Sequence, residues 1–375
     1  MKNIALIMQG SRQWSGGLEY IRNLVKALAA AKAIDPRIED LRIQLVIRGP
    51  VDPEYYEDLK PLVHAIVPIN EGRLAYLRFL IGNSFDFIYP YFRTSGFLPN
   101  LRGSAWIPDF QHKHLPDYFS KKDREDRDKL YEAIAKNNSQ LVLSSDAAAQ
   151  DFEKFYRNKA PSIKAHVLRF RTRLGDEIFS ENPALYLRKY HLPDKFFMIS
   201  NQWWAHKNHE ILIKALQQIK LDHDHAINLV WTGHPYDTRR SKHCDYIFSM
   251  IHECGLHNHI RILGLIPRRD QIQIMRSAKA VIQPSRFEGW STVVEDARCL
   301  GKEIIASDLT VHREQLGNEH DFFAADDFKK LAELMTKAWI NDELGFDSKR
   351  EEAAQNRNLE DVQNYGMQFV DLCGF

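Results

Sequence analysis

Residues 278–307 read AKAVIQPSRFEGWSTVVEDARCLGKEIIAS. The apolar runs at the two ends, 278–285 and 303–307, predict buried strands, and residues 292–300 between them predict a helix. Two neighbouring strands joined through a helix run parallel, because the helix returns the chain to the edge of the sheet from which the first strand started. This stretch therefore predicts a parallel sheet covered by helices.

The same alternation extends in both directions along the chain. Further strands are predicted at 3–8, 41–47, 85–89, 104–108, 140–145, 195–200, 227–233 and 260–264. Charges, a glycine and a proline interrupt the pattern at 170–192. We therefore expect two doubly wound, Rossmann-like α/β domains at 1–170 and 193–345, joined by a linker at 171–192. Residues 346–375 are expected to form a C-terminal helix that packs back on the first domain.

The composition is that of a folded protein with two domains. The chain has 375 residues, of which 44% are apolar and 27% charged, and these values exclude a disordered or fibrous protein. The first residues lack the apolar length of a signal peptide, and no later stretch predicts a membrane span. The four cysteines have no C-x-x-C spacing, so we predict reduced thiols, a cytoplasmic location and no disulfide framework or zinc site.

The net charge of +1 hides an uneven distribution. Residues 1–175 contain 27 Lys and Arg against 20 Asp and Glu, whereas residues 176–375 contain 24 against 30. A basic first half can attract an anionic acceptor or the headgroups at the inner face of a membrane. Ordinary solvated faces also produce a difference of this size, so the hypothesis of peripheral membrane contact stands beside that simpler one. No nucleic-acid partner is expected.

The first candidate for a binding loop is 10–17, which precedes the first predicted helix. Free backbone amides and the helix dipole make such a junction suitable for an anion, so Gly16 and Gly17 are candidate donor-binding residues. The spacing matches neither the dinucleotide-binding nor the P-loop fingerprint, and Arg48 follows the second strand where a dinucleotide enzyme would need an acid. Dehydrogenases and P-loop enzymes are therefore excluded. The alternative is that the two glycines only permit a tight turn.

The second candidate is the loop at 106–116, WIPDFQHKHLP, which follows a predicted strand. It contains Asp109, His112 and His114, and loops at strand ends line the binding sites of α/β proteins. A histidine near its ordinary pKa can act as a base or orient an acceptor hydroxyl. The alternative is a set of surface histidines without a chemical role.

The third candidate is SNQWWAHKNHE at 200–210, where a strand ends and Asn208 is expected to cap the next helix. Lys207 precedes this helix N-terminus, and a lysine beside unsatisfied amides favours a phosphate. The alternative is a solvated lysine, with Trp203 and Trp204 serving only in packing.

The fourth candidate, at 286–295, places Glu288 on the loop after a buried strand and Glu295 in the first turn of the next helix. The amides of Trp290, Ser291 and Thr292 are expected to hold an anionic diphosphate. Thr292 and Glu295 also have the spacing of a capping box, which would explain Glu295 without a ligand. Glu288 has no such local duty and is the stronger functional candidate.

One motif resembles a metal site but is not predicted to be one. Asp222-His-Asp224 has the D-x-D spacing that some sugar transferases use for a divalent cation. It lies in a polar stretch between a helix and a strand, which favours a solvated turn. His252, His257 and His259 lack further ligands at a suitable spacing. We predict no metal site.

At the fourth candidate the sequence resembles the retaining glycosyltransferases of family 4, also called glycosyl transferases group 1. PSRFEGWSTVVEDA at 284–297 is similar to the family signature P-S-x-x-E-G-x-G, which is followed by a second glutamate at the start of a helix. Further matches occur in the family's order over nearly the whole chain: Gly16-Gly17, the loop near 106–116, Lys207-Asn208, WTG at 231–233, LGLIP at 263–267 and SDLTVHREQ at 307–315.

The resemblance implies a GT-B fold, in which the two Rossmann-like domains face each other across a cleft. It further implies a hexosyltransferase-type glycosyltransferase that retains anomeric configuration and requires no metal or other cofactor. The implied donor is a UDP- or GDP-linked sugar bound mainly to the C-terminal domain. The implied acceptor is a hydroxyl of a glycan or a lipid-linked molecule, such as in polysaccharide biosynthesis.

The resemblance also implies roles for single residues. The expected catalytic residues are Glu288, His112 and Lys207, and the expected acceptor-side residues are Asp109 and His112. The expected donor-binding residues are Gly16, Gly17, Gln202, Lys207, Gly233, Ile266, Arg286, Trp290, Ser291, Thr292 and Glu295. Among these, Lys207 is expected on the diphosphate, Glu295 on the ribose, and Gly233 and Ile266 near the nucleobase.

Two departures from the family pattern are visible. Six residues separate Glu288 from Glu295, whereas the common pattern has seven. Gln202 stands where many members have an arginine on the diphosphate, so Lys207, helix amides or Arg286 must supply more of the positive charge. Two rival hypotheses stay open. One is a nucleotide-sugar epimerase on the same fold, which also needs a cleft, a diphosphate site and carboxylates, and the other is a non-catalytic sugar-nucleotide-binding protein, which these departures favour.

Overall fold

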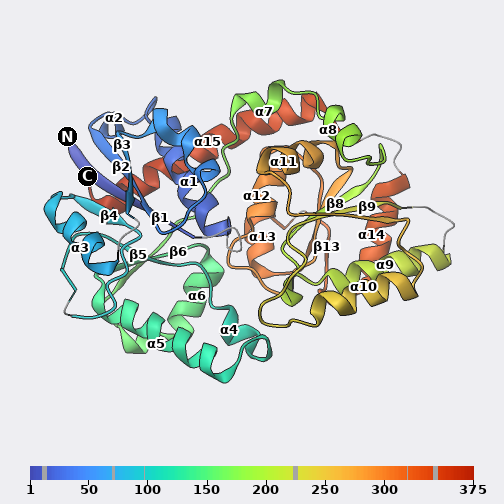
Figure 1. Cartoon of the computed structure of the whole chain (residues 1–375), viewed down its shortest axis with the longest axis horizontal. Coiled ribbons are helices and arrows are strands. Elements are labelled where there is room, and N and C mark those ends of the chain that lie inside the picture. The colour runs from blue at the N-terminus through green and yellow to red at the C-terminus, as the bar shows by residue number, and fades with distance from the viewer. Residues whose placement is uncertain (11–14, 70–71, 97, 223–226, 319, 341–344) are drawn as a thin grey trace. The chain divides into compact units, whose positions relative to one another are not determined.

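The computed structural model describes residues 1–375 except 11–14, 70–71, 97, 223–226, 319 and 341–344. The described chain forms two compact units, which Figure 1 shows in one view. The first unit contains residues 1–113, 120–173 and 357–375, and the second contains 114–119 and 174–356. No helix of the described part combines the length and the apolar character needed to cross a membrane.

The first unit is built from short parallel strands and helices. Its strands are β1 (Lys2–Gln9), β2 (Leu41–Arg48), β3 (Ala65–Ile69), β4 (Phe87–Tyr89), β5 (Ala105–Ile107), β6 (Gln140–Leu143) and β7 (Lys164–Val167). Its helices are α1 (Ser15–Ala31), α2 (Pro36–Glu39), α3 (Arg73–Gly82), α4 (Gln111–His114), α5 (Lys121–Asn137) and α6 (Asp146–Phe155), with short 3-10 turns η2 (Pro53–Tyr55), η3 (Glu57–Leu62) and η5 (Arg157–Lys159).

These strands form two parallel sheets, of order β3-β2-β1-β4 and β5-β6-β7. All five strands predicted in this half are present. The edge strands β3 and β7 were not predicted, because Pro68 interrupts the apolar run of the first and the second reads KAHV. Proline and polar residues are tolerated at a sheet edge, where fewer backbone groups and side chains are buried.

The second unit repeats the alternation of strand and helix. Its strands are β8 (Phe197–Ser200), β9 (Leu229–Thr232), β10 (Ile260–Gly264), β11 (Ala280–Gln283), β12 (Ile304–Ser307) and β13 (Phe322–Phe323). Its helices are α7 (Asp176–Ser180), α8 (Ala184–Lys189), α9 (His209–Asp222), α10 (His243–Glu253), α11 (Arg268–Ser277), α12 (Thr292–Cys299), α13 (Thr310–Leu316) and α14 (Phe328–Ile340), with 3-10 turns η4 (Pro116–Tyr118) and η6 (Ala205–Lys207).

A single parallel sheet of order β10-β9-β8-β11-β12-β13 organises this unit. The chain starts at β8, continues outward through β9 and β10, and then returns to β11 beside β8. The strand order therefore reverses between β8 and β11, and loops leaving the carboxyl ends of two such strands diverge to make a binding site. The predicted parallel, doubly wound sheet is confirmed.

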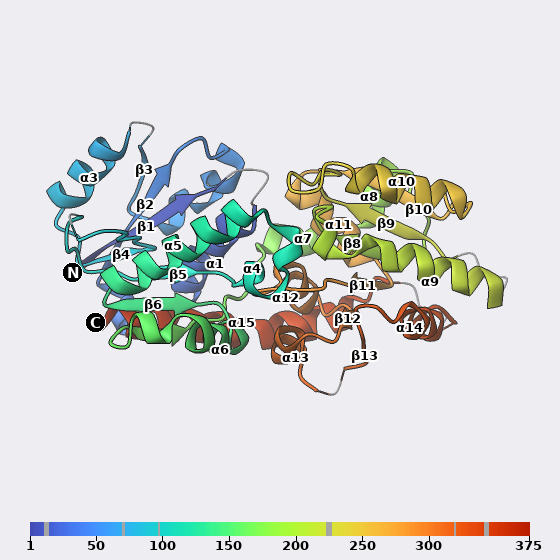
Figure 2. The ribbon, with the colours of Figure 1, turned by 90° about the horizontal axis from the view of Figure 1, so that it is seen from below.

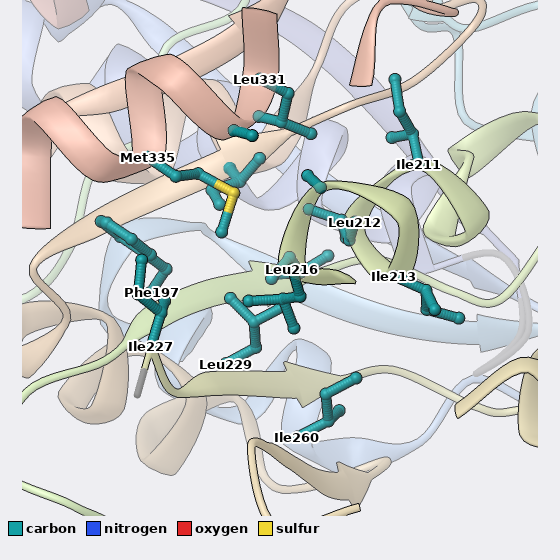
Figure 3. Packing of buried hydrophobic residues seen from close by; sticks show 14 of the residues in the cluster. Phe197, Ile211, Leu212, Ile213, Leu216, Ile227, Leu229, Ile260, Leu331 and Met335 are labelled. Carbon is teal, nitrogen blue, oxygen red and sulfur yellow. The ribbon is translucent and has the colours of Figure 1, made fainter. Parts of the chain in front are cut away.

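Alternate residues of the central strands pack on opposite faces of the sheet. On one face, Phe197 and Leu229 pack with residues of α9, α10 and α14, and Figure 3 shows Leu212, Leu216 and Met335 in this layer. Residues of α11 and α12 cover the other face. Figure 2 shows α9, α10 and α14 on one side and α11 and α12 on the other. Burial on both faces explains why these strands read as continuous apolar runs.

The C-terminal helix α15 (Ser348–Cys373) contributes to both units, as predicted. Its residues from 357 onward belong to the first unit, where Phe369 packs against Tyr89 with ring centroids 5.2 Å apart. A Cβ at Gly366 would lie 2.6 Å from the Ala27 carbonyl oxygen, so glycine permits α15 to lie close to α1. The segment predicted as an irregular linker contains the short helices α7 and α8.

Candidate functional site

The two strongest candidate residues lie at the point where the strand order of the second unit reverses. Lys207 ends the turn η6 that follows β8, and Glu288 lies on the loop that follows β11. Because β8 and β11 are paired neighbours, their carboxyl ends bring the two loops together. The Lys207 Nζ donates to the Glu288 Oε1 over 2.7 Å, so residues 81 positions apart form one site.

This Lys207–Glu288 pair is largely removed from water. The side chains are 15% and 9% exposed. Burial raises the pKa of Glu288, but the adjacent Lys207 ammonium, together with Ser285 and His312, outweighs burial and holds the pKa of this carboxyl below its usual value. Glu288 is therefore a carboxylate at neutral pH, and an anionic ligand at this place would compete with it for the lysine.

The side-chain amides of Gln283 and Asn201 form a row of hydrogen bonds that ends at the Glu288 carboxylate. The Gln283 Nε2 donates to Glu288 Oε1 over 2.9 Å, and the Asn201 Nδ2 donates to the Gln283 Oε1 over 2.9 Å. Asn201 follows β8 and Gln283 ends β11, so both lie at the same sheet edge. Hydrogen bonds from buried amide side chains restrict the position of the carboxylate, and such preorganisation is what a binding site requires.

The loops of the pair are tied to each other through Asn208 and Arg286. Asn208 has a left-handed backbone, with φ of 61°, and its Nδ2 donates to the carbonyls of Pro284 and Ala325 over 3.0 and 2.7 Å. The Arg286 amide donates to the His206 carbonyl over 2.8 Å. The Asn208 side chain, expected to cap α9, therefore fastens the loops after β8 and β11 to one another.

The start of α12 differs from the predicted capping box. The N-cap is Ser291, whose hydroxyl accepts from the Val294 amide, and Thr292 is already inside the helix. The prediction of a Thr292 cap is wrong by one residue, because Ser291 retains extended backbone angles of −86° and 113° and offers its own hydroxyl. The Ser291 amide itself donates to the Gln315 Oε1 over 3.1 Å, so it is engaged within the unit.

Glu295 is held inside the unit by side chains. Its carboxylate accepts from Arg298 over 3.1 and 3.2 Å and from the Gln315 Nε2 over 3.0 Å, and its side chain is 0% exposed. Trp290, which precedes the same helix, is also buried. Glu295 lies on the same helix end as the Glu288 loop, and an external ribose would have to reach a carboxylate that is already bonded.

The predicted nucleobase residues lie along the neighbouring strand ends. Gly233 has a φ of +106°, and a Cβ there would lie 2.0 Å from the Asn201 carbonyl oxygen, so the position requires glycine. The Gln202 Oε1 accepts from the His234 amide over 2.9 Å and so fixes the loop after β9. Ile266, after β10, is half-buried against the core. All three lie at the carboxyl edge that carries the Lys207–Glu288 pair.

In the first unit, His112 is a core residue. It lies on α4, its side chain is 0% exposed, and its Nε2 lies 3.0 Å from the Asp128 Oδ1 and 3.1 Å from the Tyr156 hydroxyl. Burial lowers the pKa of His112 below its usual value although Asp128 opposes this effect, so the ring is neutral at pH 7. His114, which belongs to the second unit, is exposed, and its ring lies 5.2 Å from that of Phe287.

The other candidates of the first unit lie at the ends of β1 and β5. Asp109 is half-buried, and its Oδ1 accepts from the Gln111 amide over 3.0 Å. Gly16 and Gly17, expected in a loop, are in the first turn of α1, and the rest of that loop, 11–14, lies outside the described residues. Of the D-x-D sequence only Asp222 is described, at the end of α9. Within the described ranges, no three His, Cys, Asp or Glu side chains are arranged to hold a metal ion.

Sequence reasoning did not identify His312, a buried residue that interacts electrostatically with both Lys207 and Glu288. Its side chain is fully buried, its Nδ1 bonds the Ser307 carbonyl over 2.8 Å, and its Nε2 has no hydrogen-bond partner among the described residues. Burial lowers the pKa of His312, while the Glu288 charge acts in the opposite direction. The only sequence signal was its place in SDLTVHREQ, which does not distinguish a buried histidine from an exposed one.

Because of His209, on the first turn of α9, we expect the unfolding free energy of the second unit to decrease at acidic pH. It is fully buried between Trp203 and Trp231, and burial lowers its pKa to about 3 from an ordinary value of 6.5. The unfolded chain therefore binds the extra proton first, so the contribution of neutral His209 is complete above pH 6.5 and is lost as the pH falls. From pH 6.5 to 5 this histidine alone should cost about 2 kcal/mol of unfolding free energy.

Replacing His209 by phenylalanine should remove that share of the pH dependence, because the ring packing is kept and the titrating nitrogen is lost. Urea unfolding of the variant and the wild type at pH 5, 6 and 7 measures the difference. His252→Gln on the exposed side of α10 is the matched control and should leave the slope unchanged. Equal slopes for His209→Phe and the wild type would contradict the burial argument.

A protein-family model matches most of the second unit. Residues 188–358 match the family model described as "Glycosyl transferases group 1". No curated protein matches the chain at the level of sequence. Most of the second unit is therefore similar to glycosyl transferases group 1, and the resemblance inferred from residues 284–297 is confirmed at that level. Membership of family 4 in particular stays a prediction.

Solved structures extend the likeness to the whole chain. Sucrose-phosphate synthase from Thermosynechococcus elongatus is 17% identical with a TM-score of 0.71, covering 99% of this chain and 98% of that one. HepE from Anabaena, in complex with UDP and glucose, is 16% identical with a TM-score of 0.71 and full coverage of both chains. A glycosyltransferase from Rickettsia africae is 15% identical with a TM-score of 0.66, covering 99% and 97%. The chain has the GT-B fold of these proteins.

Proposed function

We propose that this protein transfers a sugar from a nucleoside diphosphate sugar to a hydroxyl group of a glycan or lipid-linked acceptor. The observation that carries the proposal is the Lys207–Glu288 pair at the strand-order reversal of the second unit. Both side chains are largely buried. The lysine can bind a diphosphate, and the carboxylate can accept hydrogen bonds from the hydroxyls of the attached sugar. HepE, which shares the fold, binds UDP and glucose, and this likeness supports a UDP-linked donor.

In the proposed reaction the bond from the anomeric carbon to the diphosphate oxygen breaks, and a bond to the acceptor oxygen forms. The acceptor proton passes to the departing diphosphate, so charge and atoms balance without a further reactant. Lys207 leaves Glu288 to neutralise the charge that grows on the diphosphate, with Arg286 and the first amides of α12 as further donors. This arrangement supplies positive charge from the chain itself, and we propose transfer with retention and without a metal.

The donor can be found by ligand stabilisation. A ligand at 100 times its Kd stabilises the folded state by about 2.7 kcal/mol, which a thermal shift detects. We expect either UDP and UDP-linked sugars or GDP and GDP-linked sugars to raise the melting temperature, and the nucleotides with the other base to leave it unchanged. Stabilisation by neither nucleotide, at concentrations up to millimolar, would remove the basis of the proposal.

Product analysis separates the proposal from its rivals. With the stabilising donor and a panel of sugar and lipid-linked acceptors, we expect a glycosylated product that retains the anomeric configuration. Conversion of the donor to an epimer without any acceptor would favour the epimerase. Calorimetric binding of the donor without turnover of any acceptor would favour a binding protein.

A lipid-linked acceptor would bring the first unit to a membrane surface, and we propose that α3 contributes to this contact. Leu74 and Ile81 on this helix are 72% and 55% exposed, and Arg78 between them is exposed as well. Apolar side chains beside a cation favour the interface of an anionic bilayer. Leu74→Asp should reduce flotation with phosphatidylglycerol vesicles several-fold and leave a soluble-acceptor reaction unchanged, and equal flotation would reject this role.

A further inference from the structure

A second group of cations lies at the opposite edge of the sheet in the second unit. Lys279 directly precedes β11, and Lys302 precedes β12, so both lie at the amino ends of strands. The Lys207–Glu288 pair follows the carboxyl ends of β8 and β11, at the other edge. Together with Arg350 from the first turn of α15, the two lysines line a cavity of about 110 Å³.

The cavity has room for more than water alone. One water needs about 10–15 Å³ of such space. A volume of about 110 Å³ therefore accommodates several waters or one compact polyatomic anion. Both basic and acidic side chains line the cavity, so its affinity for an anion depends on which of these charges are already paired within the chain.

Three carboxylates line the cavity, those of Glu303, Asp347 and Glu351, and the last two form hydrogen bonds within the unit. Glu351 accepts from the Arg276 guanidinium at both oxygens, over 2.7 and 2.8 Å. The Asp347 Oδ1 accepts from the amides of Lys349 and Arg350 over 3.0 and 3.1 Å and thereby caps α15. The charges of Glu351 and Asp347 still act on Lys302 and oppose the effect of Arg350, so an anion in the cavity would bind beside them.

The cations are engaged less completely. Among the described residues, the Lys302 Nζ donates to two neutral carbonyls, those of Arg276 over 3.0 Å and of Gly345. Burial together with Arg350 lowers the pKa of Lys302 to about 7. Lys279 is 7% exposed, and in the described part of the chain its ammonium has no hydrogen-bond or ion-pair partner. An anion in the cavity would give this ammonium a charged hydrogen-bond partner.

We propose that the cavity between Lys279, Lys302 and Arg350 binds a small tetrahedral oxyanion, either free phosphate or the phosphate group of a monoester. Three cations from three segments surround a space of suitable size, and phosphate oxygens accept several charge-assisted hydrogen bonds at once. The site is separate from the donor site, since it lies at the amino ends of the strands. It is a second place on this unit at which a phosphorylated metabolite can bind.

Isothermal titration of the Lys207→Ala variant with inorganic phosphate, at constant ionic strength, tests the proposal without interference from the donor site. One equivalent of phosphate should bind. Lys279→Met should weaken binding at least 10-fold, and Arg350→Ala, on the exposed side, should weaken it several-fold. Lys349→Ala, the neighbour on α15 that does not line the cavity, is the matched control and should bind as its parent does.

Two further readouts keep the result unambiguous. Sulfate does not titrate near neutral pH, so uptake of a proton when sulfate binds at pH 7.5 would report Lys302, whose charged form the anion stabilises. Glucose 6-phosphate distinguishes the two sources, because tighter binding than inorganic phosphate indicates a monoester and weaker binding indicates the free ion. Absence of phosphate and sulfate binding, or equal affinity in Lys279→Met and its parent, would overturn the proposal whether or not the protein transfers sugars.

Discussion

Replacing Lys207 by alanine is expected to lower kcat about 100-fold or more, which is the range seen when one group that stabilises transition-state charge is lost. The lysine is the cation that the loop after β8 brings to the Glu288 carboxylate, 2.7 Å away. As the diphosphate departs, its charge grows, and the lysine binds it more strongly than it binds the intact donor. The effect should therefore appear in kcat, measured at saturating donor and acceptor.

Loss of Lys207 also leaves Glu288 without its ion-pair partner, so a structural effect must be separated from a chemical one. Glu288→Gln keeps the hydrogen-bonding shape without the charge, and the double variant Lys207→Met, Glu288→Gln removes both charges together. We expect the double variant to recover thermal stability and to remain at least 100-fold slower than the wild type. Recovery of both stability and rate would show that the pair is structural.

A matched control is available on the next helix. Lys214 pairs with Glu210 on the outer side of α9, and its side chain is 44% exposed. Lys214→Ala removes a lysine and an ion pair of the same unit without touching the strand-order reversal. Its kcat should stay within about twofold of the wild type, since exposed pairs of this kind contribute about 0.5 kcal/mol or less.

The parts of the fold that were predictable are those that local sequence specifies. The strands β8, β9, β11 and β12 of the second unit are buried on both faces, so their apolar runs could be recognised without knowing their neighbours, whereas the two-residue edge strand β13 was not predicted. The edge strands β3 and β7 have polar or proline-containing sequences and were missed. Local sequence also placed the α12 cap one residue too late, because Ser291 and Thr292 both carry a hydroxyl and only backbone angles decide between them.

The candidate site was predictable where a charged residue lies shortly after a buried apolar strand, as Lys207 and Glu288 do. It was not predictable where a residue's partner is distant in sequence. Glu295 is neutralised by Arg298 and bonded by Gln315, 20 positions away, and Gln283 reaches Asn201 across 82 positions. His112 illustrates the same limit, since a loop histidine and a core histidine look alike until Asp128 is known to lie 3.0 Å from it.

The largest expected loss of stability comes from Arg276, at the end of α11. Its side chain is 1% exposed, and its guanidinium donates to both oxygens of Glu351, to the carbonyls of Ile178 and Glu181, and to the Gln273 Oε1. Arg276→Met should lower the unfolding free energy of the second unit by about 3–5 kcal/mol, because it leaves a buried carboxylate and several carbonyls without donors. Hydrogen exchange of the α11 amides measures this unit separately from the first.

The double variant Arg276→Met, Glu351→Met tests whether the loss comes from the abandoned charge. Replacing both partners by apolar side chains removes the uncompensated carboxylate, so most of the stability should return, although the carbonyls of Ile178 and Glu181 stay without this donor. Arg269→Met is the matched control on the same helix: its side chain is 58% exposed, its partner is Glu181, and the expected change is within about 1 kcal/mol. A similar small change for Arg276→Met would mean that water reaches Glu351 and that α15 is not fastened to α11 by this pair.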